Sequence, residues 1–176
     1  VKQKPLLVIP VAAPVQQPAF DLDATPSQST RPSCETTEDG ALVAVSSKYT
    51  AISEGRIVRM DEVQVSAAAQ EIADRYHMNP VIAQLVVQEA DHVFGGIPGF
   101  LLTFKDGILS PNAGLDRSNI PNGYAVLFPQ YPYRSAETLR QGLQAEFGVQ
   151  LGLILTDSWL MPGRLGTTGV ALATAG

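Results

Sequence analysis

Short uninterrupted runs of apolar residues recur along this chain, and these runs predict β-strands. Residues 6–11 (LLVIPV), 41–47 (ALVAVSS) and 149–156 (VQLGLILT) have little polar alternation, which is typical of strands buried within a sheet. A Lys-Asp-Gly turn sequence separates residues 100–104 from residues 107–110, so we expect a β-hairpin there. Further extended segments are expected at residues 55–58, 124–128 and 169–174.

Three other segments place apolar residues three or four positions apart, which predicts helices. Residues 66–76 carry one apolar face of this kind. A second helix is expected to begin after Asn79, a suitable N-cap, and to continue to the glycine pair at 95–96. A third is expected over residues 136–147, with Gly148 in the left-handed capping position.

Together these elements predict an α+β fold, a mixed sheet with flanking helices, because strands and helices do not alternate strictly and no internal repeat occurs. We expect one domain over residues 1–176, in which residues 16–39, rich in Pro, Ser and Thr, form a mobile loop. The sequence begins at Val1 rather than Met and ends at Gly176 directly after an expected strand, so we expect a fragment of a longer protein.

The composition limits the kinds of molecule that the protein is expected to bind. The chain has 176 residues, a hydrophobic fraction of 45% and a net charge of −5, which predicts an ordinary globular core and no affinity for nucleic acid or anionic membranes. No apolar run has the length of a membrane span. A single cysteine, Cys34, excludes an internal disulfide and favours a reducing compartment, so a cytoplasmic location is expected.

Two aspartates are the best candidates for chemistry. Asp116 follows an Asn-Ala-Gly turn within PNAGLDRSN, and Asp157 ends the apolar run VQLGLILTDS. Two carboxylates at the ends of separate buried segments suit a divalent cation that shares its ligands with phosphates, and Ser158 could add an oxygen ligand. The structural alternative is that Asp116 forms a turn and that Asp157 caps the element after its strand, and the spacing alone favours this alternative.

Other polar segments allow both functional and structural interpretations. Ser46, Ser47 and Lys48 end an expected strand, where they could hold phosphates or form a solvated strand end. Residues 162–169 (PGRLGTTG) suit an anionic substrate or a plain surface loop. Neither a Walker-type phosphate loop nor a GxGxxG fingerprint is present, so any nucleotide site must be built in another way.

Glu89 lies on the apolar stripe of the second expected helix. An inward carboxylate is costly without a partner, so we expect Glu89 to meet an arginine or a metal. Glu89-x-x-His92 is similar to the pattern of carboxylate-bridged iron bundles, although only one copy is present. His77 and His92 are most simply residues at helix ends.

Four stretches, VSSKYTAISEGRIV, DGILSPNAGLDRSNIP, AETLRQGLQAEFGVQLGLILTDS and PGRLGTTGVAL, follow one another in this chain. In this order they resemble the coenzyme F-420:L-glutamate ligase (gamma-glutamyl ligase) family. The resemblance runs from residue 6 to the last residue and is strongest over residues 100–169. It implies a glutamate-ligase-like fold that here lacks its C-terminal part, because the family's chains continue well beyond Gly176.

The resemblance implies a ligase that depends on GTP and on Mg²⁺ or Mn²⁺. Such enzymes join L-glutamate to the lactyl carboxylate of the deazaflavin precursor of coenzyme F-420 through an acyl phosphate, and the family pairs as homodimers. The positions that match the family's motifs would be the metal ligands Asp116, Asp157 and Ser158 and the GTP contacts Pro14, Ser47, Lys48 and Asn119.

The chain also departs from the family pattern. Ile52 stands where the family has a lysine, Leu160-Met161 replaces Gly-Arg, and further departures lie at Val15, Asp106 and Gly163. The first hypothesis is therefore a ligase domain that needs the family's C-terminal part. The alternative is a non-catalytic relative that acts as a binding or assembly module, and a third hypothesis is a metal-binding protein built around Glu89 and His92.

Overall fold

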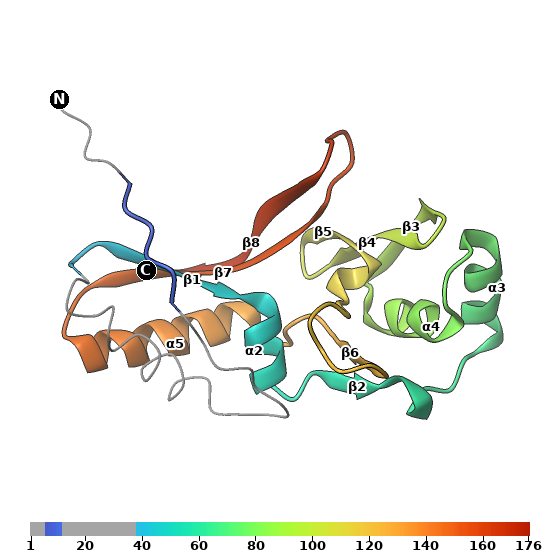
Figure 1. Ribbon diagram of the computed structural model, residues 1–176, viewed down its shortest axis with the longest axis horizontal. Helices are drawn as coiled ribbons and strands as arrows, with labels where there is room; N and C mark the ends of the chain where they lie inside the picture. The colour runs from blue at the N-terminus through green and yellow to red at the C-terminus, as the bar shows by residue number, and fades with distance from the viewer. Residues whose placement is uncertain (1–5, 12–37) are drawn as a thin grey trace.

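The computed structural model of the chain describes residues 6–11 and 38–176 (Figure 1). Its elements, in chain order, are β1 (Ala41–Ser46), α2 (Ser47–Ser53), β2 (Ile57–Arg59), the 3₁₀ turn η1 (Met60–Glu62), α3 (Ala67–Tyr76), α4 (Pro80–Glu89), β3 (His92–Ile97), β4 (Phe100–Lys105), β5 (Ile108–Pro111), the 3₁₀ turn η2 (Asn112–Gly114), β6 (Tyr124–Val126), α5 (Pro132–Phe147), β7 (Leu151–Leu160) and β8 (Thr167–Ala175). Pro14, Val15 and most of the expected loop lie outside the described residues.

A mixed sheet and one helix form the larger core. The strand order is β1-β7-β8, with β1 parallel and β8 antiparallel to β7. Helix α5 lies along this sheet (Figure 1), and its Leu139 and Leu143 pack against Leu153, Leu155 and Leu172. The α+β prediction of a mixed sheet with flanking helices is therefore confirmed.

A second group of elements lies at the other end of the long axis (Figure 1). Strands β3, β4 and β5 form an antiparallel meander, and α4 packs Ile82 and Val86 against Leu101 of β4. The predicted hairpin between β4 and β5 is confirmed. Its turn is Asp106-Gly107, and both residues have positive φ, 48° and 82°, as a two-residue turn that matches the strand twist requires.

Local capping signals predicted the helix ends well where they were present. The Ser66 hydroxyl accepts from the Ala69 N–H at the start of α3, and the Asn79 side chain caps α4. Helix α5 ends at Gly148 with a φ of 69°, as predicted. It begins at Pro132, about one turn before the predicted start.

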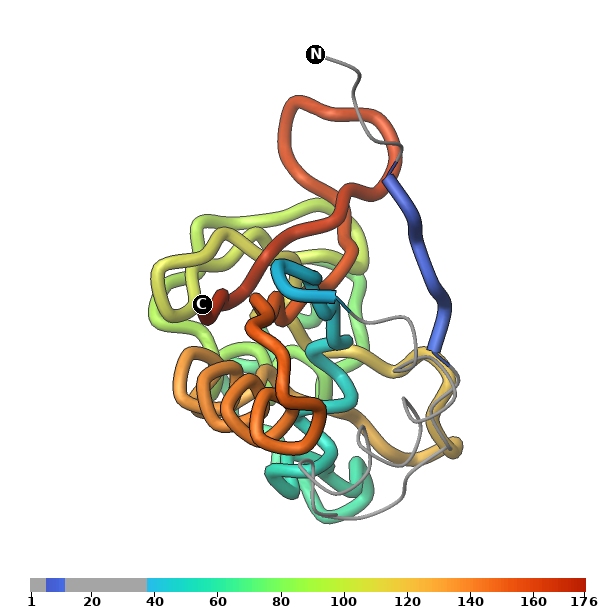
Figure 2. Tube along the Cα trace, turned by 90° about the vertical axis from the view of Figure 1, so that its left-hand side faces the viewer, coloured from blue at the N-terminus to red at the C-terminus, as the bar shows by residue number. Residues whose placement is uncertain are grey.

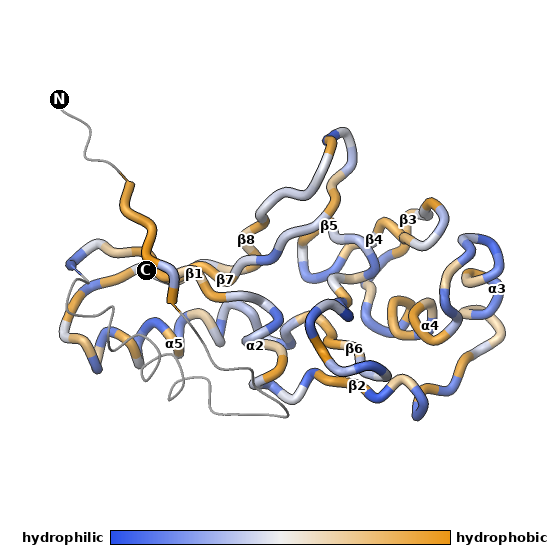
Figure 3. Tube along the Cα trace, viewed as in Figure 1, coloured by the Kyte–Doolittle hydropathy of each residue, from blue (hydrophilic) through white to orange (hydrophobic). Residues whose placement is uncertain are grey.

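Two expectations were wrong, and one helix was not predicted. Helix α4 ends at Glu89, and the next residues form β3, because pairing with β4 outweighs the helical spacing of Val93. Residues 6–11 pair with no described strand, and Leu6 is 90% exposed, so this apolar segment (orange in Figure 3) is not a buried strand. Helix α2 was not predicted at all; its stability comes from burial of Ala51 and Ile52 rather than from propensity.

The distal part of the β7–β8 hairpin extends away from the rest of the chain (the loop at the top of Figure 2). No helix in the described part of the chain combines the length and the apolar character that crossing a bilayer would need. The prediction of a single domain stays a prediction.

Candidate functional site

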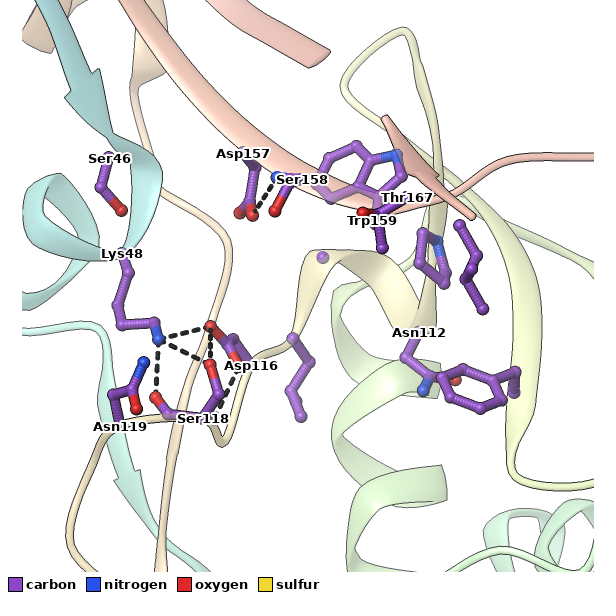
Figure 4. A pocket seen from close by; sticks show the side chains of 15 residues that line it. Ser46, Lys48, Asn112, Asp116, Ser118, Asn119, Asp157, Ser158, Trp159 and Thr167 are labelled. Atoms are coloured by element: carbon purple, nitrogen blue, oxygen red, sulfur yellow. Dashed lines mark hydrogen bonds and ion pairs between the residues drawn. The ribbon is translucent and has the colours of Figure 1, made fainter. Parts of the chain in front are cut away.

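A polar cavity of about 470 Å³ lies where the end of β1, the start of α2 and the turn η2 face the C-terminal part of β7 (Figure 4). Its volume is in the range of small-molecule sites. The polar side chains that line it belong to Ser46, Lys48, Asn112, Asp116, Ser118, Asn119, Asp157, Ser158 and Thr167. The structure therefore gathers here most of the residues that the sequence singled out.

The Asn-Ala-Gly turn aims Asp116 into this cavity. Asn112, Ala113 and Gly114 all have positive φ, at 50°, 54° and 72°. The turn is held by the Asn112 side chain, which accepts from the Leu101 N–H at 2.9 Å, and by the Ala113 N–H, which donates to Thr103 Oγ1 at 2.8 Å. This unusual backbone is thus fixed by buried hydrogen bonds, which is common at functional sites.

Asp116 is bound from two sides. Its carboxylate accepts the Ser118 N–H at 2.7 Å and the Ser118 hydroxyl at 3.1 Å, and it lies 2.7 Å from the Lys48 ammonium. Burial acts to raise the pKa of Asp116, but the hydrogen bonds of Lys48 and Ser118 and the charge of Lys48 outweigh it and lower the pKa. The carboxylate is therefore ionised at neutral pH. The turn interpretation also holds, because the Ser118 contact is an Asx turn.

Lys48 reaches across the cavity from the first turn of α2 (Figure 4). Besides Asp116 it donates to the Ser118 carbonyl oxygen at 2.6 Å and to the Ser118 hydroxyl at 2.9 Å. An ammonium has three donors, so these contacts use all of them. Any phosphate that binds Lys48 must replace one of these contacts.

Asp157 lies within β7 and is held by its own set of donors. The Ser47 hydroxyl donates to Oδ2, and the Ser158 N–H donates to Oδ1 at 2.7 Å. Ser47 can reach Asp157 because β1 runs parallel to β7, with Ser46 opposite Thr156. Strand β7 continues to Leu160, so the expectation that Asp157 caps an element after its strand is wrong.

The predicted site residues have different positions in the structure. Lys48, Asp116, Asn119, Asp157 and Ser158 line the cavity. Ser47 is only 3% exposed and does not line it, so its hydroxyl orients Asp157. Pro14 lies outside the described residues.

Sequence reasoning missed Trp159, which forms one wall of the cavity together with Thr167. Thr167 belongs to the Gly-rich segment 162–169, whereas Arg164 of the same segment donates to Thr168 and does not line the cavity. The alternation of side chains along a strand could have predicted Trp159. Asp157 and Trp159 lie two residues apart on β7, so their side chains are expected on the same face.

The donor set suits a hard divalent cation in part. Asp116 and Asp157 offer carboxylate oxygens and Ser158 a hydroxyl, which are the ligand types of Mg²⁺ and Mn²⁺. Within residues 6–11 and 38–176, no cluster of three or more His, Cys, Asp or Glu could hold a metal ion. A cation here would need further oxygens from water or phosphate, which is how Mg²⁺ commonly binds in phosphate-transfer sites.

Glu89 has a structural partner. Arg56 Nη2 lies 2.5 Å from Glu89 Oε2, and both side chains are mostly buried. Of the expected partners, an arginine or a metal, the structure therefore has the arginine. His92 lies on β3 with its ring 4.6 Å from that of Phe94, so it is not a helix-end residue, and in the part of the chain that the structure describes neither it nor Glu89 belongs to a group of three or more His, Cys, Asp or Glu that could hold a metal ion. His77, by contrast, caps α3, as predicted.

Ile52 is 7% exposed and packs in a small core with Ala51 and Val126. It does not line the polar cavity. In this structure the departure at position 52 therefore lies behind the cavity wall, and Lys48 is the basic residue among those that line the cavity.

An α+β fold that brings paired carboxylates and a lysine around a polar cavity agrees with what the resemblance implies for a ligase. Residues 10–176 match a protein family model described as F420-0:gamma-glutamyl ligase, and the chain belongs to this family. Three curated relatives, each named coenzyme F420:L-glutamate ligase, come from Archaeoglobus fulgidus, Methanopyrus kandleri and Haloarcula marismortui and are 36%, 34% and 34% identical. Each alignment covers 79% of this chain and 56% of the relative, so the chain spans about half the length of the curated relatives it matches.

Proposed function

We propose that this chain takes part in the GTP-dependent joining of L-glutamate to the carboxylate of the deazaflavin precursor of coenzyme F-420. The observation that carries the proposal is the polar cavity, in which Asp116, Asp157 and Lys48 converge from three separate segments of a chain that belongs to the gamma-glutamyl ligase family. The name of the curated relatives, coenzyme F420:L-glutamate ligase, supports L-glutamate and a coenzyme F420 compound as the molecules that are joined.

The proposed metal ligands are Asp116, Asp157 and Ser158. A bound Mg²⁺ or Mn²⁺ would neutralise phosphate charge in the cavity. Two carboxylates against one lysine leave this cavity with an excess of negative charge, which favours a cation when no nucleotide is present. Ser47 acts indirectly, because its buried hydroxyl fixes the orientation of the Asp157 carboxylate.

Lys48 and Asn119 are the proposed contacts to the GTP phosphates among the residues that line the cavity. Lys48 would exchange a contact with a neutral Ser118 oxygen for one with an anionic phosphate oxygen, so that both partners of the hydrogen bond would be charged. Ser47 and Pro14 were also implied as GTP contacts. Ser47 lies one layer behind the cavity surface, which favours the positioning role instead.

The proposed reaction has two steps, phosphoryl transfer and amide formation. An oxygen of the precursor's carboxylate attacks the γ-phosphorus of GTP, and the bond to the bridging oxygen breaks, which gives an acyl phosphate and GDP. The amine of L-glutamate then attacks the acyl carbon, phosphate leaves with the electrons of the broken C–O bond, and the amine loses a proton to solvent. Lys48 holds the phosphate oxygens in place, so that the carboxylate can approach in line.

We also propose a cytoplasmic homodimer, since the resemblance implies pairing and the chain has a single cysteine. Light scattering on the purified chain at several concentrations tests the dimer. A monomer mass at every concentration would contradict it.

The experiment for the ligase activity is incubation of the chain, extended by the C-terminal part that the first hypothesis requires, with GTP, Mn²⁺, L-glutamate and the deazaflavin precursor. Mass spectrometry should detect the precursor with one added glutamate, together with GDP. An Asp157→Asn variant should make no product, whereas Asp61→Asn, on the exposed turn η1, should match the unmodified chain. Absence of product in all three proteins would overturn ligase activity for this chain.

The alternative is a non-catalytic family member that acts as a binding or assembly module. Leu160 and Met161 favour it, because they replace the Gly-Arg of the family pattern and so remove an arginine next to the cavity. Nucleotide binding without turnover in the same experiment would support this alternative.

A further inference from the structure

A second hollow of about 460 Å³ adjoins the polar cavity. It lies between the β3–β4 hairpin and the end of β7, and every residue that lines it is apolar, glycine or proline. Three residues, Phe100, Pro111 and Leu160, line both hollows. The two hollows therefore form one continuous surface with a polar end and an apolar end. We call the apolar end the apolar groove.

One wall of the apolar groove is built by an irregularity in β3. The register with β4 shifts between Val93 and Gly95, so Phe94 has no partner residue on β4. A bulge of this kind redirects the side chain of the extra residue. Phe94 is 57% exposed and Ile97 is 64% exposed, an amount of exposed apolar surface that indicates a binding face.

The floor and the opposite wall are also apolar. Gly95 and Gly96 form part of the floor, and a Cβ at Gly96 would lie 2.1 Å from the Phe100 carbonyl oxygen, so the close pairing of β3 with β4 requires glycine there. The opposite wall is Leu160 and Met161, and the Met161 thioether accepts a hydrogen bond from Trp159 Nε1 at 3.2 Å, which fixes its position.

We propose that the apolar groove binds the flat ring system of the acceptor whose carboxylate lies in the polar cavity. This inference rests on the proposed function for the identity of the acceptor. A fused aromatic ring suits two facing apolar walls, of which Phe94 and Phe100 offer aromatic faces for stacking. The polar atoms of a three-ring deazaflavin lie mainly on its pyrimidine ring, so the rest of the ring system can fill an apolar groove. Guanine suits the groove less, because polar atoms surround both of its two rings and no side chain that lines the groove can pair with them.

The test uses 5-deazariboflavin, which has a fused ring but neither phosphate nor carboxylate. Its fluorescence is followed as the 176-residue chain is added. Phe94→Ala should weaken binding by about fivefold or more, the effect of losing one ring-on-ring contact. Phe104→Ala is the matched control, since Phe104 is also partly exposed on the same sheet but does not line the groove. It should leave the affinity unchanged.

The outcomes separate this inference from the proposed function. Equal affinity of the unmodified and Phe94→Ala chains for the ring, or displacement of the ring by guanosine, would overturn the groove assignment even if GTP and Mn²⁺ bind. Binding of the ring that depends on Phe94, in a chain that does not bind GTP with Mn²⁺, would support the groove and overturn the ligase. Absence of ring binding to the unmodified chain would overturn the groove alone.

Discussion

Replacing Lys48 by Met should change the affinities for metal and nucleotide in opposite directions. The Lys48 ammonium lies 2.7 Å from Asp116 Oδ2, so a cation bound to the same carboxylate would lie close to a second positive charge. In the absence of nucleotide, Lys48 therefore competes with Mn²⁺ for Asp116. With GTP bound, the same ammonium would neutralise phosphate charge.

The magnitude follows from charge and distance. A divalent ion about 2.1 Å from the carboxylate oxygen would lie on the order of 4 Å from the ammonium. In a water-like dielectric, the repulsion between charges of +2 and +1 at that separation is about 2 kcal/mol. Lys48 can turn partly away, so we expect Lys48→Met to tighten Mn²⁺ binding by about tenfold. GTP binding should weaken by about tenfold or more, the worth of one hydrogen bond to a charged group.

The assay is calorimetric titration with Mn²⁺ alone and then with GTP at saturating Mn²⁺. Lys105→Met is the matched control, because the Lys105 side chain has the same exposure of 20% and contacts Asp91 and Asp106 instead of a cavity residue. Its affinities should equal those of the unmodified chain. Weaker or unchanged Mn²⁺ binding by Lys48→Met would refute the competition argument.

Three further results are expected. Glu89→Ala should lower the free energy of unfolding in urea by about 3 kcal/mol, because Arg56 would keep a mostly buried charge without its partner; an unchanged urea midpoint would contradict this. Gly114→Ala should lower it by about 2 kcal/mol or more, since φ is +72° and a Cβ would lie 2.6 Å from the Phe128 ring; an unchanged melting temperature would contradict the strain argument. The lowered pKa of Asp116 gives a stabilising contribution that is complete above about pH 4 and is lost as the pH falls through the folded-state pKa. Urea midpoints of the unmodified and Asp116→Asn chains should therefore converge in acid, and a constant difference down to low pH would contradict it.

Local signals in the sequence predicted local structure. Ser66 and Asn79 mark helix starts because a capping side chain acts within three residues. Asp106-Gly107 marks the hairpin for the same reason, since positive φ at both positions is a local requirement.

The pairing of strands that are distant in sequence could not be predicted from local sequence signals. The end of α4 and the strand β3 depend on pairing with β4, which no local pattern around Val93 shows. The apolar segment 6–11 reads as a strand, yet no described strand pairs with it. Strand β7 passes through the polar Thr156-Asp157-Ser158 because β8 continues to pair with it there.

For the candidate site as well, some features could be predicted from the sequence and others depend on long-range pairing. The residues alone suggested Asp116 and Asp157 as a pair, and the resemblance added Lys48 to the same site; spacing alone could not show this, since Lys48 and Ser118 are 70 residues apart in sequence. The burial of Ser47 behind Asp157 depends on the parallel pairing of β1 with β7 and could not be read from the sequence.

The most direct test of the polar cavity as a nucleotide–metal site is calorimetric titration of this chain with GTP in the presence of Mn²⁺, repeated on Asp116→Asn. We predict binding at micromolar strength for the unmodified chain and its loss in the variant, because Asp116 is both a proposed metal ligand and the partner of Lys48. Absence of heat in both proteins, or equal binding by both, would contradict the assignment.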